Sequence, residues 1–175
     1  MVGNFEFMIN WQYFPKSDSI PPHLRSVVEI IQQSEDSIKS SSNKLNSNQV
    51  LGILRKSLTD LGFAVEQNKK SSGKIKIPVL FGRNGSLEKY FEADAYCQST
   101  GTVVEIEAGR AVTNYQFLKD LFQACVMHDV NYLAIAVRNK YRNNPDFEKA
   151  ATFFDTLYAS GRMKLPLKGI LIIGY

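Results

Sequence analysis

Residues 90–107 read YFEADAYCQSTGTVVEIE, and this stretch decides the fold. Its middle, around Ser99 and Thr100, is polar and is followed by Gly101, as is typical of the turn of a β-hairpin. Apolar and acidic residues alternate on both sides of that turn, as they do in two paired strands with one face in the core. We therefore predict an antiparallel hairpin over residues 90–107.

The predicted hairpin gathers four acidic side chains on one face. With the turn centred between its two middle residues, Asp94 lies opposite Glu105 and Glu92 lies opposite Glu107. All four side chains then point to the same side, because side chains alternate along a strand. Two carboxylates with Cβ atoms about 5 Å apart repel each other by roughly 3 kcal/mol at an effective dielectric constant of 20.

Such repulsion needs compensation. Solvent, pairing with lysine, raised pKa values or a divalent cation would each provide it. A hard cation such as Mg²⁺ prefers oxygen ligands and keeps part of its water shell. Spacing alone therefore leaves two interpretations open, a solvated acidic face and a metal site.

The arrangement of these acids resembles the PD-(D/E)XK superfamily of restriction and repair nucleases. The resemblance is carried by Glu92-Ala-Asp94 and by Val103-Val-Glu105-Ile-Glu107, with ten residues between Asp94 and Glu105. Members carry an Asp on one hairpin strand and an (Asp/Glu)-x-Lys on the next. The predicted order of helix, strand, hairpin, helix and strand over about residues 47–140 also resembles the superfamily. It implies a restriction endonuclease-like α/β fold, a mixed sheet flanked by helices.

The resemblance also implies roles for individual residues. Asp94 matches the metal-binding Asp and Glu105 the second metal ligand, with Mg²⁺ or Mn²⁺ as the cofactor. Glu107 is a departure, because it stands where the superfamily usually has lysine, although some members have Glu or Gln there. Glu107 would then act as a general base or bind a second metal ion, with Arg110 supplying positive charge. An ordinary surface role for Arg110 stays open.

A further carboxylate often comes from a helix before the hairpin in that superfamily. Glu35 falls within the apolar stripe of a helix that we predict from Pro21 to Ile38, and an inward-facing acid needs a partner. Glu35 is therefore our candidate for an additional metal ligand. The alternative is a Glu35 that points to water near the helix end.

We predict one restriction endonuclease-like domain over residues 1–175. Residues 1–46 form an N-terminal helical extension, residues 47–140 the nuclease-like core, and residues 141–175 a basic C-terminal helix and strand. Residues 132–137 are apolar without alternation, as expected of a central strand buried on both faces. The remaining predicted elements are helices over 47–61, from 113 and from 144 to 161, and strands over 63–66, 75–81 and 169–174.

The positive charge is concentrated at the end of the chain. The net charge is +4, and residues 138–175 account for it with seven basic and three acidic side chains. Arg138, Lys140 and Arg142 follow the central strand and are candidates for contacts with nucleic-acid phosphates. A solvated charged surface is the alternative interpretation.

Several classes of protein find no support in the sequence. It has no P-loop, dinucleotide fingerprint or G-x-S-x-G elbow, so we expect no nucleotide cofactor. The two cysteines are far apart, and no apolar run reaches the roughly 18 residues of a membrane span. We expect a cytoplasmic, Mg²⁺-dependent endonuclease, a hydrolase of phosphodiester bonds in double-stranded DNA that acts as a homodimer. The alternatives are an inactive nuclease-fold module that binds nucleic acid or protein, and a metal-dependent hydrolase of another substrate.

Overall fold

The chain begins with a strand and a run of helices, continues with a run of strands, and alternates helix and strand only in its last third. The structure, a computed structural model, describes residues 9–175. The elements are β1 (Asn10–Phe14), α1 (Pro22–Gln33), α2 (Glu35–Ile38), α3 (Ser47–Asp60), β2 (Ala64–Val65), β3 (Ile75–Phe81), β4 (Leu87–Ala93), β5 (Ala95–Cys97), β6 (Thr102–Glu107), α4 (Gln116–Val126), β7 (Tyr132–Val137), α5 (Asp146–Ser160) and β8 (Gly169–Gly174). Short 3₁₀ turns occupy Ser71–Gly73 and Arg83–Gly85.

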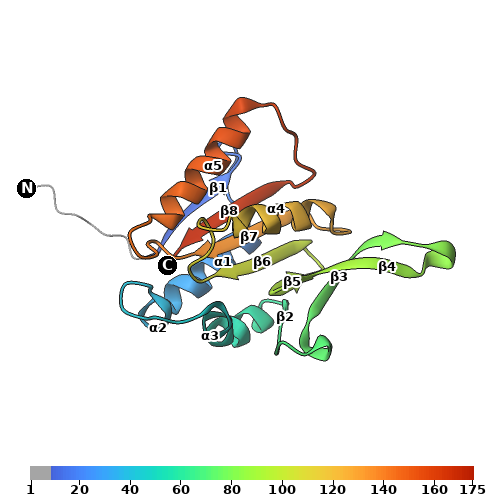
Figure 1. Cartoon of the computed structure of the whole chain (residues 1–175), viewed down its shortest axis with the longest axis horizontal. Coiled ribbons are helices and arrows are strands. Elements are labelled where there is room, and N and C mark those ends of the chain that lie inside the picture. Colours follow the sequence, from blue (N-terminus) through green and yellow to red (C-terminus); the bar gives the residue numbers. More distant parts are fainter. Residues whose placement is uncertain (1–8) are drawn as a thin grey trace, which may run out of the picture.

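The main sheet has six strands in the order β1-β8-β7-β6-β5-β2 (Figure 1). Strands β6, β7 and β8 are parallel, so their carboxyl ends meet at one edge of the sheet. Strands β1 and β5 run antiparallel to their neighbours β8 and β6. The predicted mixed α/β fold is therefore confirmed.

Helices cover both faces of this sheet. Alternate residues of β7 enter different cores: Ala134 packs with α1 and α3, and Ile135 packs with α4 and α5. Residues 133–137 of β7 are all buried, which confirms the prediction of a central strand. No helix within residues 9–175 is long and apolar enough to cross a membrane.

The predicted hairpin is only partly right. Strands β5 and β6 pair in the expected register, with Ala95 opposite Val104. Upstream of β5 the chain leaves the main sheet, and β4 pairs with β3 in a separate two-stranded sheet. Glu92 consequently lies opposite Lys76. The prediction that Glu92 faces Glu107 is wrong, because β4 pairs along its length with β3 and not with β6.

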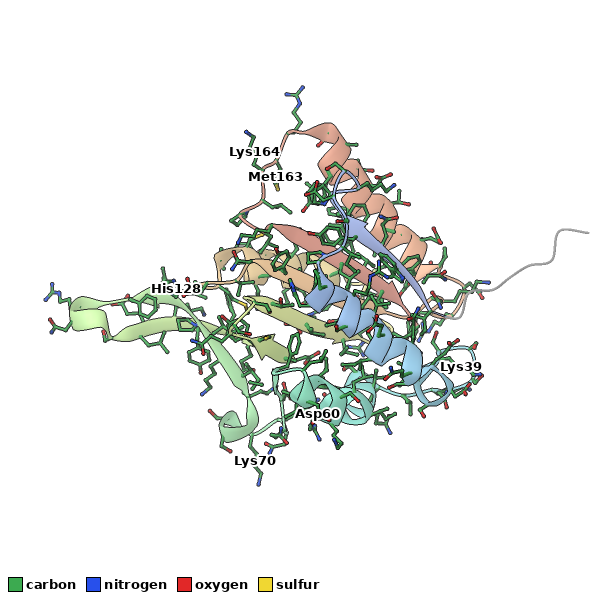
Figure 2. All side chains as sticks on the ribbon, turned by 180° about the vertical axis from the view of Figure 1, so that it is seen from behind. Lys39, Asp60, Lys70, His128, Met163 and Lys164 are labelled. Carbon is green, nitrogen blue, oxygen red and sulfur yellow. The ribbon has the colours of Figure 1, made fainter. Side chains whose placement is uncertain are left out.

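The β3–β4 sheet projects from the body as an arm (Figure 1). Its exposed apolar side chains include Leu80, Phe81 and Leu87. His128, at the base of the arm (Figure 2), donates its backbone N–H to the carbonyl oxygen of Pro78, and its ring lies 5.3 Å from that of Phe81.

The beginning of the chain also departs from the prediction. The single helix expected over 21–38 is interrupted at Ser34, whose backbone N–H is shared between the carbonyl oxygens of Ile30 and Ile31. Strand β1 was not predicted, and it makes the region before residue 46 partly β-structure rather than a helical extension. Residues 1–8 lie outside the described part of the chain.

Candidate active site

Two of the predicted site residues are carried by β6. Glu105 and Glu107 lie on the face that α4 covers, because they alternate with the core residues and Val103 of the same face packs with Phe117 of α4. Glu105 is only 9% exposed. The acidic face is therefore buried under a helix, and the interpretation as a solvated surface is wrong for Glu105.

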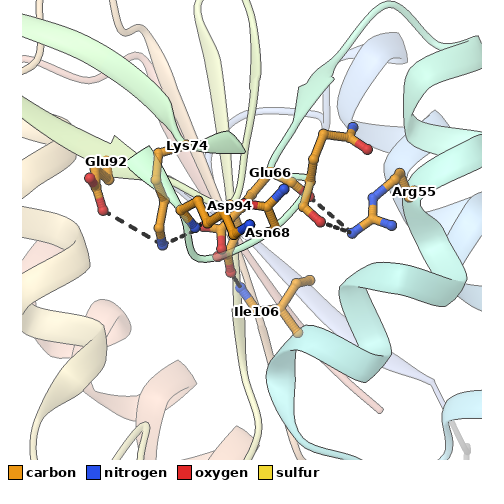
Figure 3. Close-up of polar contacts among 9 residues, drawn as sticks. Arg55, Glu66, Asn68, Lys74, Glu92, Asp94 and Ile106 are labelled. Atoms are coloured by element: carbon orange, nitrogen blue, oxygen red, sulfur yellow. Dashed lines mark hydrogen bonds and ion pairs between the residues drawn. The ribbon is translucent and has the colours of Figure 1, made fainter. Parts of the chain in front are cut away.

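Asp94 occupies the bend at which the chain passes from β4 to β5. Its Oδ2 atom accepts the backbone N–H of Ile106 at 2.8 Å (Figure 3). The backbone N–H of Asp94 in turn donates to the carboxylate of Glu105. These hydrogen bonds connect the bend that carries Asp94 to β6, which carries Glu105, and leave other oxygen lone pairs on each carboxylate.

Asp120 on α4 completes the group and was not identified from the sequence. It is 4% exposed and shares a hydrogen bond with the carboxyl group of Glu107, while its Oδ2 atom is buried without a partner. Asp120 lies on the apolar stripe of α4 formed by Phe117, Leu121 and Ala124. An acid on an apolar stripe was the signal that directed us to Glu35, and the same signal would have found Asp120. We call Asp94, Glu105, Glu107 and Asp120 the acidic cluster.

Burial is the main cause of unusual pKa values in the acidic cluster. It raises the pKa of Asp94 to about 6, that of Asp120 to about 7 and that of Glu107 to about 8. The pKa of Glu105 is also raised well above its ordinary value, first by burial and then by the charge of Asp94. The neighbouring carboxylates thus add to the effect of desolvation, and the cluster retains protons near neutral pH.

Two lysines act on the acidic cluster from outside. The ammonium group of Lys74 lies 2.8 Å from Glu66 and 3.6 Å from Glu92 (Figure 3), and its charge lowers the pKa of Asp94. Lys119, next to Asp120 in the chain, is exposed and forms no ion pair within residues 9–175. Its charge favours the ionised forms of both Asp120 and Glu107.

The other predicted site residues lie elsewhere. Arg110 is exposed in the loop after β6, and it is not among the charges that act most strongly on the acidic cluster. Glu35 begins the short α2, and its Oε1 atom is buried without a partner, but it too is absent from those charges. Arg138, Lys140 and Arg142 follow β7 and line a cavity. The structure therefore brings Asp94, Glu105 and Glu107 together, whereas Glu35 lies on α2 and Arg110 in the loop after β6.

The acidic cluster offers oxygen donors of the kind that Mg²⁺ and Mn²⁺ prefer. The buried, unpartnered Oδ2 atom of Asp120 and the proton-retaining carboxyl groups fit a cation that would neutralise them. As the side chains stand, no three His, Cys, Asp or Glu residues of the described chain converge on one metal position. Metal binding would therefore require the carboxylates to move closer together.

Neither a comparison with protein-family models nor a comparison with curated proteins finds a match to this chain.

Proposed function

We propose that this protein is a metal-dependent endonuclease that hydrolyses phosphodiester bonds of DNA. The observation that carries the proposal is the acidic cluster, four carboxyl groups buried together with raised pKa values at β6 and α4. Active sites are where proteins retain such costly arrangements. The element order α3, β3, the β5–β6 hairpin, α4 and β7 supports it, since the nuclease superfamily that the sequence resembles has the same order.

Asp94 and Glu105 would hold Mg²⁺ or Mn²⁺ in this proposal. Their relative position is fixed by the hydrogen bonds between each carboxylate and the backbone of the segment that carries the other, the bend before β5 and strand β6. Bound there, the cation would polarise the scissile phosphate and lower the pKa of a water molecule. The strands supply the rigid support that a catalytic site needs.

Glu107 and Asp120 would move the protons. The pKa of Glu107 is raised to about 8 and that of Asp120 to about 7, so the pair exchanges a proton near neutral pH, as a general acid or base must. Lys119 would supply the positive charge that the motif lysine supplies in the superfamily, in place of the Arg110 that the sequence suggested. Arg138, Lys140 and Arg142 would contact phosphates of double-stranded DNA.

The proposal extends to the assembly and the compartment. One site cuts one strand, so cleavage of both strands would be achieved most simply by a homodimer. The cysteines Cys97 and Cys125 are unpaired, which suits a reducing, cytoplasmic setting.

A second candidate function is binding without catalysis. Glu107 in place of the motif lysine favours it, as does the lack of a converged set of three ligands within residues 9–175. A domain of this kind would retain DNA or a protein partner but would not hydrolyse DNA.

The decisive experiment incubates the protein with plasmid DNA and Mg²⁺ or Mn²⁺. We expect nicking or cutting by the wild type and a loss of at least about 100-fold in Asp94→Asn and in Glu105→Gln, because each removes a charged ligand. Glu29→Gln is the matched control, since Glu29 is an exposed carboxylate on α1. Cleavage that survives in both cluster variants would refute the assignment.

Calorimetric titration with Mn²⁺ separates the two candidates. We expect binding by the wild type that disappears in Asp94→Ala. Absence of binding at millimolar metal, together with salt-sensitive retention of DNA, would leave only the binding module. Metal binding with indifference to DNA at low salt would instead indicate a hydrolase of another substrate.

A further inference from the structure

A cavity of about 690 Å³ lies at the carboxyl ends of β7 and β8. Its lining includes one acidic side chain, Glu148, and five cationic ones: Lys39, Lys44, Arg138, Lys140 and Arg142. Lys44, Lys140 and Arg142 form no ion pair with any residue from 9 to 175. We call this hollow the basic cavity. Its unbalanced charge selects for an anionic ligand.

Aromatic rings form another part of the wall. Tyr141, Phe147 and Tyr175 line the cavity together with the cations. The guanidinium groups of Arg138 and Arg142 lie 5.5 and 5.3 Å from the ring centre of Tyr141. Aromatic rings and planar guanidinium groups are surfaces on which a nucleobase stacks.

The first turn of α5 faces the same space. Pro145, Phe147 and Glu148 of this turn line the cavity, and the helix has no side-chain cap. Its first backbone N–H groups and its dipole add to the positive potential that the cations create. The fully buried Asp146 also belongs to this turn, and Lys149 and Arg138 partly offset its charge.

We propose that the basic cavity binds a phosphorylated nucleoside, with the phosphate on Lys140 and Arg142 and the base against the aromatic wall. The volume lies within the range of about 300–1,000 Å³ that small-ligand sites occupy. The ligand is either a free nucleotide or the terminal nucleotide of a strand, which share this chemistry. This binding does not require the acidic cluster to be catalytic.

The main-chain conformation of Arg142 supports a ligand-binding role. Its φ of 55° is in the left-handed region, within a tight turn closed by hydrogen bonds between Tyr141 and Asn144. This conformation costs a non-glycine residue conformational free energy, and such strain is concentrated at functional sites. The substitution Arg142→Gly removes the guanidinium group at a position where glycine is favoured, so it is not expected to unfold the protein.

The test measures binding of adenosine 5′-monophosphate by calorimetry, with a chelator present to exclude metal. We expect this nucleotide to bind at least about tenfold more tightly than adenosine or inorganic phosphate alone, since each lacks one half of the recognised chemistry. The double variant Lys140→Ser/Arg142→Gly should weaken binding by about tenfold or more. The control is Arg162→Gly/Lys164→Ser, which removes the same charge from the segment between α5 and β8, outside the residues that line the basic cavity, and should bind as the wild type does.

Competition experiments identify the source of the nucleotide. A 5′-phosphorylated oligonucleotide that displaces the mononucleotide, where its 5′-hydroxyl counterpart does not, indicates capture of a strand end. Failure of both to compete indicates a free nucleotide. Three results would each overturn the proposal. Adenosine could bind as tightly as adenosine 5′-monophosphate, the double variant could bind the nucleotide as the wild type does, or an acidic peptide could bind as tightly as the nucleotide. Asp94→Asn should bind the nucleotide normally, so failure here and failure of the nuclease proposal are distinguishable.

Discussion

The acidic cluster and the basic cavity are two concentrations of like charge near one edge of the sheet, and they differ in burial. Glu105 and Asp120 are 9% and 4% exposed, whereas Lys140 and Arg142 are exposed. Water and ions screen the cations, so their mutual repulsion costs little. The carboxylates lack that screening, and their pKa values rise instead. The comparison teaches that the same concentration of charge costs more where a helix covers it than where solvent reaches it.

The largest expected consequence is a dependence of stability on pH. The unfolded chain releases its carboxyl protons near pH 4, whereas burial raises the pKa of Asp94 to about 6, of Asp120 to about 7 and of Glu107 to about 8. Between pH 4 and these raised pKa values, the folded protein holds more protons than the unfolded chain. Its free energy of unfolding therefore falls as the pH rises. Because one pKa unit corresponds to about 1.4 kcal/mol, we expect a loss of several kcal/mol between roughly pH 5 and pH 9.

Urea unfolding with a chelator present, followed by circular dichroism at several pH values, measures this loss. Millimolar Mg²⁺ should restore most of it at high pH if the cluster binds the ion, by linkage of binding to folding. Stability that is constant or rises from pH 5 to pH 9 would contradict the burial of charge in the cluster.

Removal of one carboxyl charge from the acidic cluster should reduce its dependence of stability on pH. Glu107→Gln abolishes one of the groups that repel Asp94 and Asp120. We expect the metal-free variant to be about 2 kcal/mol more stable than the wild type near pH 9 and unchanged near pH 5, where Glu107 is protonated. Urea unfolding at the two pH values checks this, with the exposed Glu29→Gln as the control that should change neither. A stabilisation of the same size at both pH values would assign the effect to packing instead.

The local pattern was sufficient to predict much of the scaffold of the site. The strand at 75–81 and those at 132–137 and 169–174 appear with the predicted bounds, and the turn at Ser99 and Thr100 set the register of β5 against β6. These features depend on alternation, apolar runs and turn residues, which are all short-range. The predicted opposition of Asp94 and Glu105 followed from them.

The remaining parts depend on contacts between distant segments. The alternation of apolar and polar residues in 87–93 predicts a strand but does not indicate its partner. The prediction therefore paired Glu92 with β6, whereas β4 pairs with β3. Asp120 reaches Glu107 only because α4 packs back on β6. The basic cavity joins Lys39, Arg138 and Tyr175, which are separated by most of the chain. The excess of basic residues near the end of the sequence indicated Arg138, Lys140 and Arg142, but it did not indicate that they line a cavity.

The smallest expected effect tests Gly109, which lies against the aromatic wall of the basic cavity. Gly109, two residues after Glu107, has a φ of +119°, and a Cβ atom there would clash with the Tyr141 ring of the basic cavity. Gly109→Ala should therefore displace that ring and lower the affinity for adenosine 5′-monophosphate several-fold, at a cost of about 1 kcal/mol in stability. Gly62→Ala is the control, because Gly62 has a φ of +93° but no atom within 4 Å of the added Cβ. It should show a similar loss of stability and unchanged nucleotide affinity. Equal affinity in the two variants would mean that Tyr141 is not part of the binding wall, because only Gly109→Ala places a methyl group against its ring.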